Sequence, residues 1–287
     1  MASSVGSFTL SSLPVAEEEL INFEAILAVM NRRHKTSVDQ DNGDSDTDDQ
    51  QDEISNKKTG YCHFNEDGSN KTFSLSLFGH NLEIQQDPSS QQLGHGAVVW
   101  DAAVIFTKYM EHDPKQFSAE KLHGKSIIEL GSGCGLGGIA YMMKGAQVTL
   151  TDMKKVTDSL TESNAHRLYS QLNGKGKGAL PYPLITPTVR ALDWTDFESF
   201  RSDGEEEEFD FVLLTDCVFS ATLAVPLVDC IRKLSGPRST VYCCHEIRDE
   251  VELSLLVQYL RDIVFLYLFV LFPISTVFRG NFYQLNS

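Results

Sequence analysis

The chain has 287 residues, of which 41% are hydrophobic, and its 24 basic and 40 acidic side chains give a formal net charge of −16. The hydrophobic fraction is ordinary for a protein with a packed core, whereas the acidic balance argues against a nucleic-acid partner, which requires clustered Lys and Arg. The six cysteines form no C-x-x-C pair and the N-terminus has no secretory pattern, so we expect a reducing compartment, the cytoplasm with the nucleus as a second location.

Residues 1–60 are expected to lie outside the main domain. Apolar side chains at helical spacing predict an amphipathic helix over residues 15–32. Residues 39–53 are rich in Asp and contain no Lys or Arg, which is typical of a solvated, disordered segment.

Residues 61–95 are expected to form a β-hairpin extension, because apolar and polar residues alternate on both sides of Phe78-Gly79-His80-Asn81. A helix from about Val98 to Glu111 should follow, ending before Pro114.

Strands and helices alternate over residues 96–262. Short apolar runs predict strands at Ser126–Leu130, Gln147–Thr151, Thr188–Leu192, Phe209–Leu214 and Ser239–His245, with helices starting at Gly137 and covering about 154–170 and 222–234. This order predicts an α/β, Rossmann-like fold with a mostly parallel, twisted sheet and helices on both faces.

Residues 263–287 form an unusually hydrophobic C-terminal tail. Ten uninterrupted apolar residues precede Pro273, fewer than the roughly 20 that cross a bilayer as a helix. The pattern favours a buried strand over a membrane anchor, and we do not expect a membrane partner.

The stretch IIELGSGCGLGG, residues 127–138, contains two overlapping glycine patterns. Gly133, Gly135 and Gly138 match the dinucleotide-binding G-x-G-x-x-G, which would indicate an NAD-dependent oxidoreductase. The other frame is E-x-G-x-G-x-G, formed by Glu129, Gly131, Ser132, Gly133 and Gly135. A carboxylate at Glu129 would repel a pyrophosphate and attract the ammonium and sulfonium of S-adenosylmethionine, so we favour the second frame and that cofactor.

Asp152 supports an adenosyl ligand in either frame. It ends the strand after the glycine turn, and 152 − 131 = 21 residues separate it from Gly131, the distance at which an acid can bind ribose hydroxyls.

Six segments occur in the order seen in methyltransferase family 16, the seven-strand protein-lysine methyltransferases. They are GHGAVVWDAAVIFTKYME (94–111), IIELGSGCGLGG (127–138), VTLTDM (148–153), ALDW (191–194), FDFVLLTDCVF (209–219) and VYCCHE (241–246). The chain resembles this family over about residues 72–260, and most resembles the branch that includes the valosin-containing-protein lysine methyltransferase.

The resemblance implies a class I methyltransferase fold, S-adenosylmethionine as cofactor, no metal, and a lysine side chain of a protein as acceptor, with a chaperone or an ATPase as candidate substrate. Trp100 would border the cofactor pocket, Trp194 would pack near the adenine, and Thr215 would face the cofactor. Asp216 would bind the lysine ammonium at the mouth of the site, and Phe219 would wall the lysine channel.

Two features depart from the family pattern. Phe219 stands where many members have the Tyr of D-x-x-Y and cannot donate a hydroxyl hydrogen bond. The hydrophobic tail replaces two strands that carry polar residues in the family, and we expect it to leave the domain poorly closed. A catalytically weak binding module therefore stands as a second alternative.

Overall fold

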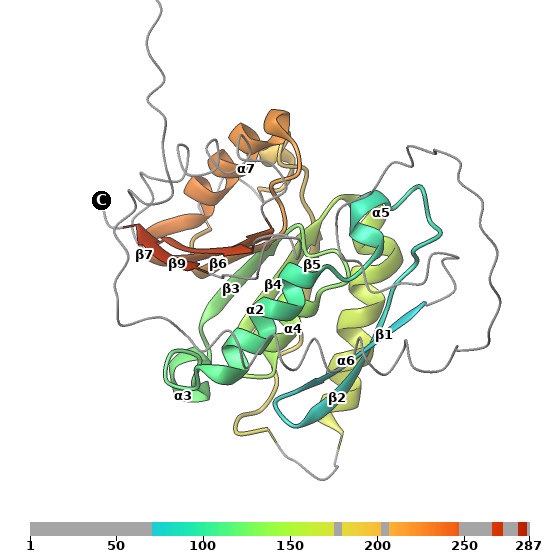
Figure 1. Ribbon diagram of the computed structural model, residues 1–287, viewed down its shortest axis with the longest axis vertical. Helices are drawn as coiled ribbons and strands as arrows, with labels where there is room; N and C mark the ends of the chain where they lie inside the picture. The colour runs from blue at the N-terminus through green and yellow to red at the C-terminus, as the bar shows by residue number, and fades with distance from the viewer. Residues whose placement is uncertain (1–70, 175–179, 202–206, 247–265, 272–280, 286–287) are drawn as a thin grey trace, which may run out of the picture.

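The computed structural model of the protein describes residues 71–174, 180–201, 207–246, 266–271 and 281–285 (Figure 1). The expected helix over residues 15–32 and the acidic segment 39–53 lie outside these ranges.

An antiparallel hairpin leads into the domain, as predicted. Strand β1, Thr72–Leu77, pairs with β2, His80–Gln85, and places Leu75 opposite Leu82. Phe78 and Gly79 make the turn with φ angles of 48° and 79°. The apolar face of the hairpin is buried in the same core as the first long helices, because alternate strand residues point to one side.

The main sheet has seven strands in the order β5-β4-β3-β6-β7-β8-β9. Its strands are β3 Ser126–Leu130, β4 Gln147–Asp152, β5 Thr188–Ala191, β6 Phe209–Thr215, β7 Ser235–Glu246, β8 Leu266–Leu271 and β9 Asn281–Leu285. All neighbours pair in parallel except β8 and β9, which are antiparallel. The predicted parallel sheet is confirmed, and the hydrophobic tail contributes two strands to it.

Helices cover both faces of this sheet, also as predicted. The longer helices are α2 Asp101–His112, α4 Leu136–Met142, α6 Glu162–Asn173 and α7 Ala221–Leu234. In Figure 1, α2 and α4 lie together on one face and α7 on the other. Alternation along β3 explains the two layers, because Ile127 belongs to the core under α2 and α4, whereas Ile128 and Leu130 belong to the core under α7.

Short helical turns complete the described chain: η3 Gly94–Ala97, α3 Ala119–Leu122, α5 Lys154–Val156, η4 Thr157–Thr161 and η5 Phe197–Ser199. The expected single helix over 154–170 is in fact α5, a π-helical turn at η4, and α6. Across the ranges given above, no helix has the length and hydrophobicity needed to cross a membrane.

Candidate cofactor and acceptor site

The predicted site residues converge on the carboxyl ends of the central strands. Strand β3 lies between β4 and β6, and the strand order reverses direction there, because β4 and β5 extend to one side and β6 to β9 to the other. Ligands of open α/β sheets bind at such a switch point. The loop after β3 is the glycine-rich stretch, so the topology places it in the ligand position.

The backbone of the glycine loop follows the E-x-G-x-G-x-G frame. Gly131, Gly133 and Gly135 all have positive φ angles, of 61°, 50° and 87°, a conformation that glycine adopts without steric cost. Gly138 lies inside helix α4 and does not share this conformation. A Cβ on it would come within 2.2 Å of a Leu150 methyl, so Gly138 lets α4 pack closely on β4.

The side chain of Glu129, the first residue of that frame, is buried away from the ligand position that we expected it to face. The side chain is fully buried and its Oε2 accepts a hydrogen bond from the Gly138 N–H at 2.8 Å. Burial raises the pKa of Glu129 to about 8, against the lowering effect of the Gly138 N–H. Burial thus favours the neutral form, and the carboxyl group lies beneath α4 with no exposed surface, so it is not positioned for the expected direct contact with an ammonium. Glu129 instead ties the strand end to the helix that follows the loop.

Asp152 holds the middle of the glycine loop. Its Oδ2 accepts from the Gly133 N–H at 2.8 Å and its Oδ1 from the Met153 N–H at 2.7 Å. Burial raises the pKa of Asp152, opposed by these two N–H groups. Each carboxylate oxygen can accept more than one hydrogen bond, so Asp152 can hold the loop and still bind a ribose hydroxyl.

The glycine loop carries a polar group that fits the predicted cofactor. The hydroxyl of Ser132 is buried, and among the described residues it has no hydrogen-bond partner, as expected for a group that a ligand would satisfy. A Cβ on Gly131 would meet Cys217 Sγ at 2.8 Å and the Trp194 ring at 3.2 Å. The absence of a side chain at Gly131 therefore lets Cys217 and the Trp194 ring pack directly on the loop.

Thr215 ends β6 and Asp216 follows it directly, but Asp216 is not at the mouth. Its side chain is 3% exposed, and its Oδ1 lies 3.0 Å from Nδ1 of His245, which is 1% exposed. The Glu246 N–H donates to the same Oδ1 at 3.4 Å, and the Asp216 N–H donates to the Cys244 carbonyl at 2.7 Å. The end of β7 thus binds Asp216, and the expectation that its carboxylate faces the incoming lysine is wrong.

The predicted aromatic residues lie at the rim. The Trp194 ring packs over Gly131. Phe219 is 39% exposed, and its ring centroid lies 6.3 Å from that of Trp194. Trp100 is the residue before α2, and its Nε1–H donates to the His95 carbonyl at 2.7 Å. The expected role of these rings as walls of a cofactor and acceptor cleft stays a prediction.

Cys134 and Cys217 are packing residues. Both side chains are buried, and burial raises the pKa of Cys134 to about 12 and that of Cys217 well above its usual value. A thiol in this state is a poor nucleophile. The described residues also contain no group of three or more metal-ligating side chains.

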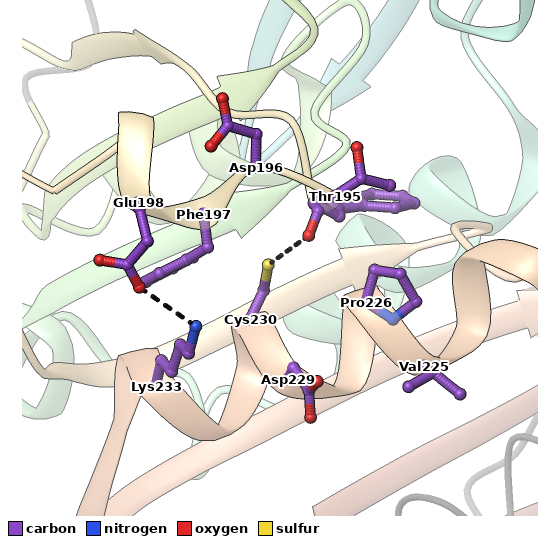
Figure 2. A pocket seen from close by; sticks show the side chains of 10 residues that line it. Thr195, Asp196, Phe197, Glu198, Val225, Pro226, Asp229, Cys230 and Lys233 are labelled. Atoms are coloured by element: carbon purple, nitrogen blue, oxygen red, sulfur yellow. Dashed lines mark hydrogen bonds and ion pairs between the residues drawn. The ribbon is translucent and has the colours of Figure 1, made fainter.

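A cavity of about 320 Å³ lies behind Trp194, between the turn at η5 and helix α7. Figure 2 shows Asp196, Glu198, Asp229 and Lys233 around it, with Lys233 3.5 Å from Glu198. Trp194 is the only predicted cofactor residue that lines it. The cavity therefore borders the site through one ring and is not the position of the glycine loop.

Two contacts of the loop were not predicted from the sequence. The Thr161 hydroxyl, in the π-turn η4, donates to the Gly133 carbonyl at 2.7 Å. Gly96, in the turn η3, places its carbonyl 3.4 Å from the Cβ position of Gly133. The signal for the second was the pair of glycines around His95, directly before the AVVWDAA segment.

Comparison with known proteins agrees with this geometry. The family model described as lysine methyltransferase matches residues 77–261. Protein N-lysine methyltransferase METTL21A of Mus musculus is 35% identical over 66% of this chain and 77% of its own length, and EEF1A lysine methyltransferase 3 of Xenopus tropicalis is 32% identical over 60% and 66%.

One similar solved structure is the T. thermophilus 16S rRNA methyltransferase in complex with AdoMet and guanosine. It is 14% identical over 74% of this chain and 50% of that chain, with a TM-score of 0.47. A match at this level carries no information on the acceptor. The family match decides against the nicotinamide alternative. The chain belongs to the lysine methyltransferases of methyltransferase family 16, and its cofactor is S-adenosylmethionine.

Proposed function

We propose that this enzyme methylates the ε-nitrogen of a lysine on a cytosolic protein, with a chaperone or an ATPase as candidate substrate. The relatives support a protein acceptor, since their names place their acceptors on proteins, in one case EEF1A. The observation that carries the proposal in this chain is the arrangement at the end of β3. The glycine loop, with its buried and unsatisfied Ser132 hydroxyl, contacts the Trp194 ring, whose centroid lies 6.3 Å from that of the exposed Phe219.

The residues of the cleft divide into a cofactor side and an acceptor side. On the cofactor side, Gly131, Ser132, Gly133 and Gly135 would line the backbone path, and Asp152 would bind the ribose. Trp194, Trp100 and Thr215 would form the walls. The bound cofactor supplies an electrophilic methyl group, and the protein must align the acceptor nitrogen with it and exclude water.

The acceptor lysine must reach the site as a neutral amine. Its ammonium has an ordinary pKa near 10.4, and transfer into an apolar cleft beside a cationic cofactor disfavours the charged form. Phe219 contributes such an apolar wall. Asp216, bound to the end of β7, acts on this side as a positioning residue that shapes the strand end from which Phe219 follows.

Titration calorimetry with S-adenosylhomocysteine tests the cofactor half. We expect binding by the wild-type chain and a loss of at least tenfold in affinity for Asp152→Ala, because charge-assisted hydrogen bonds of this kind contribute about 1.5–3 kcal/mol. Asp216→Ala should keep its affinity and lose transfer. Equal loss of affinity in both variants would refute this division of the site.

Incubation with labelled cofactor tests the acceptor half. A lysate from cells that lack this protein, mixed with the purified chain, should acquire label on lysine in a protein band that mass spectrometry then identifies. Cofactor binding with no labelled lysine would instead favour the binding-module alternative, which the missing hydroxyl at Phe219 motivates.

A further inference from the structure

A row of aromatic rings crosses the mouth of the site. The ring centroids of Trp100 and His95 are 5.8 Å apart, those of His95 and Phe219 5.1 Å, and those of Phe219 and Trp194 6.3 Å. Since the Trp194 ring lies over Gly131, the row passes beside the first glycine of the loop. His95 lies between the two rings that we expect to flank the cofactor and the acceptor.

The backbone of His95 has a defined position on the glycine loop. Its carbonyl accepts the Trp100 indole N–H at 2.7 Å, and the Gly96 N–H donates to the Leu93 carbonyl at 3.2 Å. A Cβ on Gly96 would lie 2.9 Å from the Val156 methyl groups, so the turn η3 packs closely against α5. The backbone is held while the His95 side chain is exposed.

His95 differs chemically from the other rings in the row. Phenylalanine has no polar atom, and tryptophan is a donor only. A neutral imidazole carries one nitrogen that accepts a hydrogen bond, so within this row His95 alone can accept one. Asp216, the residue expected to fill this role, has a buried carboxylate that contacts His245.

We propose that His95 contacts the substrate: its imidazole accepts a hydrogen bond from the ε-nitrogen of the acceptor lysine, beside the methylene chain that packs on Phe219. This inference rests on the proposed function. A neutral amine has two N–H groups and one lone pair, so binding one N–H restricts the direction of the lone pair. The imidazole would thus orient the nucleophile, which is the main requirement of an in-line transfer, and would supply the polar contact that Phe219 lacks.

The test compares His95→Ala, His95→Phe and His95→Gln with wild type. The readouts are the initial rate of label transfer into the lysate band and the dissociation constant for S-adenosylhomocysteine. We expect transfer by His95→Ala and His95→Phe to fall about 10- to 100-fold, the range for loss of a hydrogen bond to a reacting polar group, with cofactor affinity within twofold of wild type. His95→Gln, whose amide oxygen can accept, should retain more transfer than either.

Two further variants sharpen the result. His112→Ala removes an exposed histidine at the far end of α2 and should transfer at the wild-type rate. Phe219→Tyr in the His95→Phe background restores an oxygen acceptor beside position 95 and should recover part of the lost rate.

The outcomes separate this inference from the proposed function. Transfer by His95→Ala within twofold of wild type, or a loss matched by an equal loss of cofactor affinity, would overturn the role of His95 alone. Absence of label with the wild-type chain would overturn the proposed function and the role of His95 with it.

Discussion

Glu129 fits the glycine motif through a packing contact, and not through the charge that its residue type suggests. The residue begins the E-x-G-x-G-x-G frame, but its carboxyl group is buried under α4 and bound to the Gly138 N–H. The other oxygen, Oε1, has no hydrogen-bond partner among the described residues. A neutral carboxyl group in this place costs less than a carboxylate, because burial penalises the charged form.

Replacement of Glu129 by Gln should therefore change the pH dependence of stability. The pKa of Glu129 is about 8 in the folded protein and 4.5 as its ordinary value. Below pH 4.5 the Glu129 carboxyl group is protonated in both the folded and the unfolded protein. Above pH 4.5 it ionises first in the unfolded protein, which favours unfolding. The unfolding free energy of wild type therefore falls as pH rises to about 8. The loss approaches about 5 kcal/mol at about 1.4 kcal/mol per pH unit. Glu129→Gln keeps an acceptor for Gly138 and cannot ionise, so it should not show this loss.

Denaturant unfolding at pH 5, 6, 7 and 8 measures this difference. The gap in unfolding free energy between Glu129→Gln and wild type should widen at each step toward pH 8. Glu162→Gln, at an exposed position in α6, serves as the matched control. A constant gap across the four pH values would contradict a buried, neutral carboxyl group.

At the scale of elements, helix α4 depends on close contact with β4. Gly137 and Gly138 lie in its first turn, and a Cβ on either would overlap a neighbouring side chain, the Glu129 carboxyl group for Gly137 and the Leu150 methyl for Gly138. The two glycines let the helix axis lie close to the sheet. The N-terminus of α4, which directly follows the glycine loop, is therefore held near the end of β3.

Gly138→Ala should destabilise the protein despite the better helix propensity of Ala. The propensity gain is about 1 kcal/mol, whereas overpacking a filled core costs about 1–3 kcal/mol. The clash is with Leu150, which is fully buried and cannot turn into solvent, so we expect a net loss of up to about 2 kcal/mol, seen as a lower midpoint in thermal unfolding.

Gly174→Ala provides the comparison, because this glycine ends α6 at a negative φ of −67°, and its nearest Cβ contact would be 3.5 Å. Its midpoint should stay the same or rise. A rise for Gly138→Ala as well would mean that α4 has room to move away from β4.

The elements also show where sequence patterns were informative. Hydrophobic periodicity predicted β3, β4 and β6 within one residue and placed the hairpin turn correctly at Phe78-Gly79, because each pattern reflects a face buried along its own length. It missed the division of the 154–170 helix by the π-turn at Thr157–Thr161. That turn is stabilised by a contact of Thr161 with the distant Gly133, which a local pattern does not contain.

At the scale of the whole molecule, the hydrophobic tail belongs to the sheet. Strand β8 pairs in parallel with β7 from Val241 to Glu246, and β9 pairs with β8. Both strands extend the sheet beyond β7. This topology contradicts our expectation that the tail leaves the domain poorly closed.

Truncation after residue 262 should therefore destabilise the enzyme. It would remove β8 and β9 and leave unpaired the edge of β7 that faces β8 along Val241–Glu246, where the side chains are buried. An exposed, apolar strand edge promotes aggregation. We expect the truncated chain to elute as aggregates in size-exclusion chromatography, whereas the full chain elutes as one species; a soluble truncated chain that still binds S-adenosylhomocysteine would show that β7 needs no neighbour.

The sequence by itself determined the alternation of strands and helices, the hairpin, the glycine frame and the cofactor class, because these follow from local periodicity, backbone requirements and motif order. Only the tertiary structure decided the state of the side chains at the site. Glu129 is buried because α4 covers it, Asp216 is withdrawn because the end of β7 binds it, and His95 enters the aromatic row because η3 packs on the glycine loop. The physical reason is that burial and pairing depend on residues far apart in the chain, and a local pattern carries no record of them.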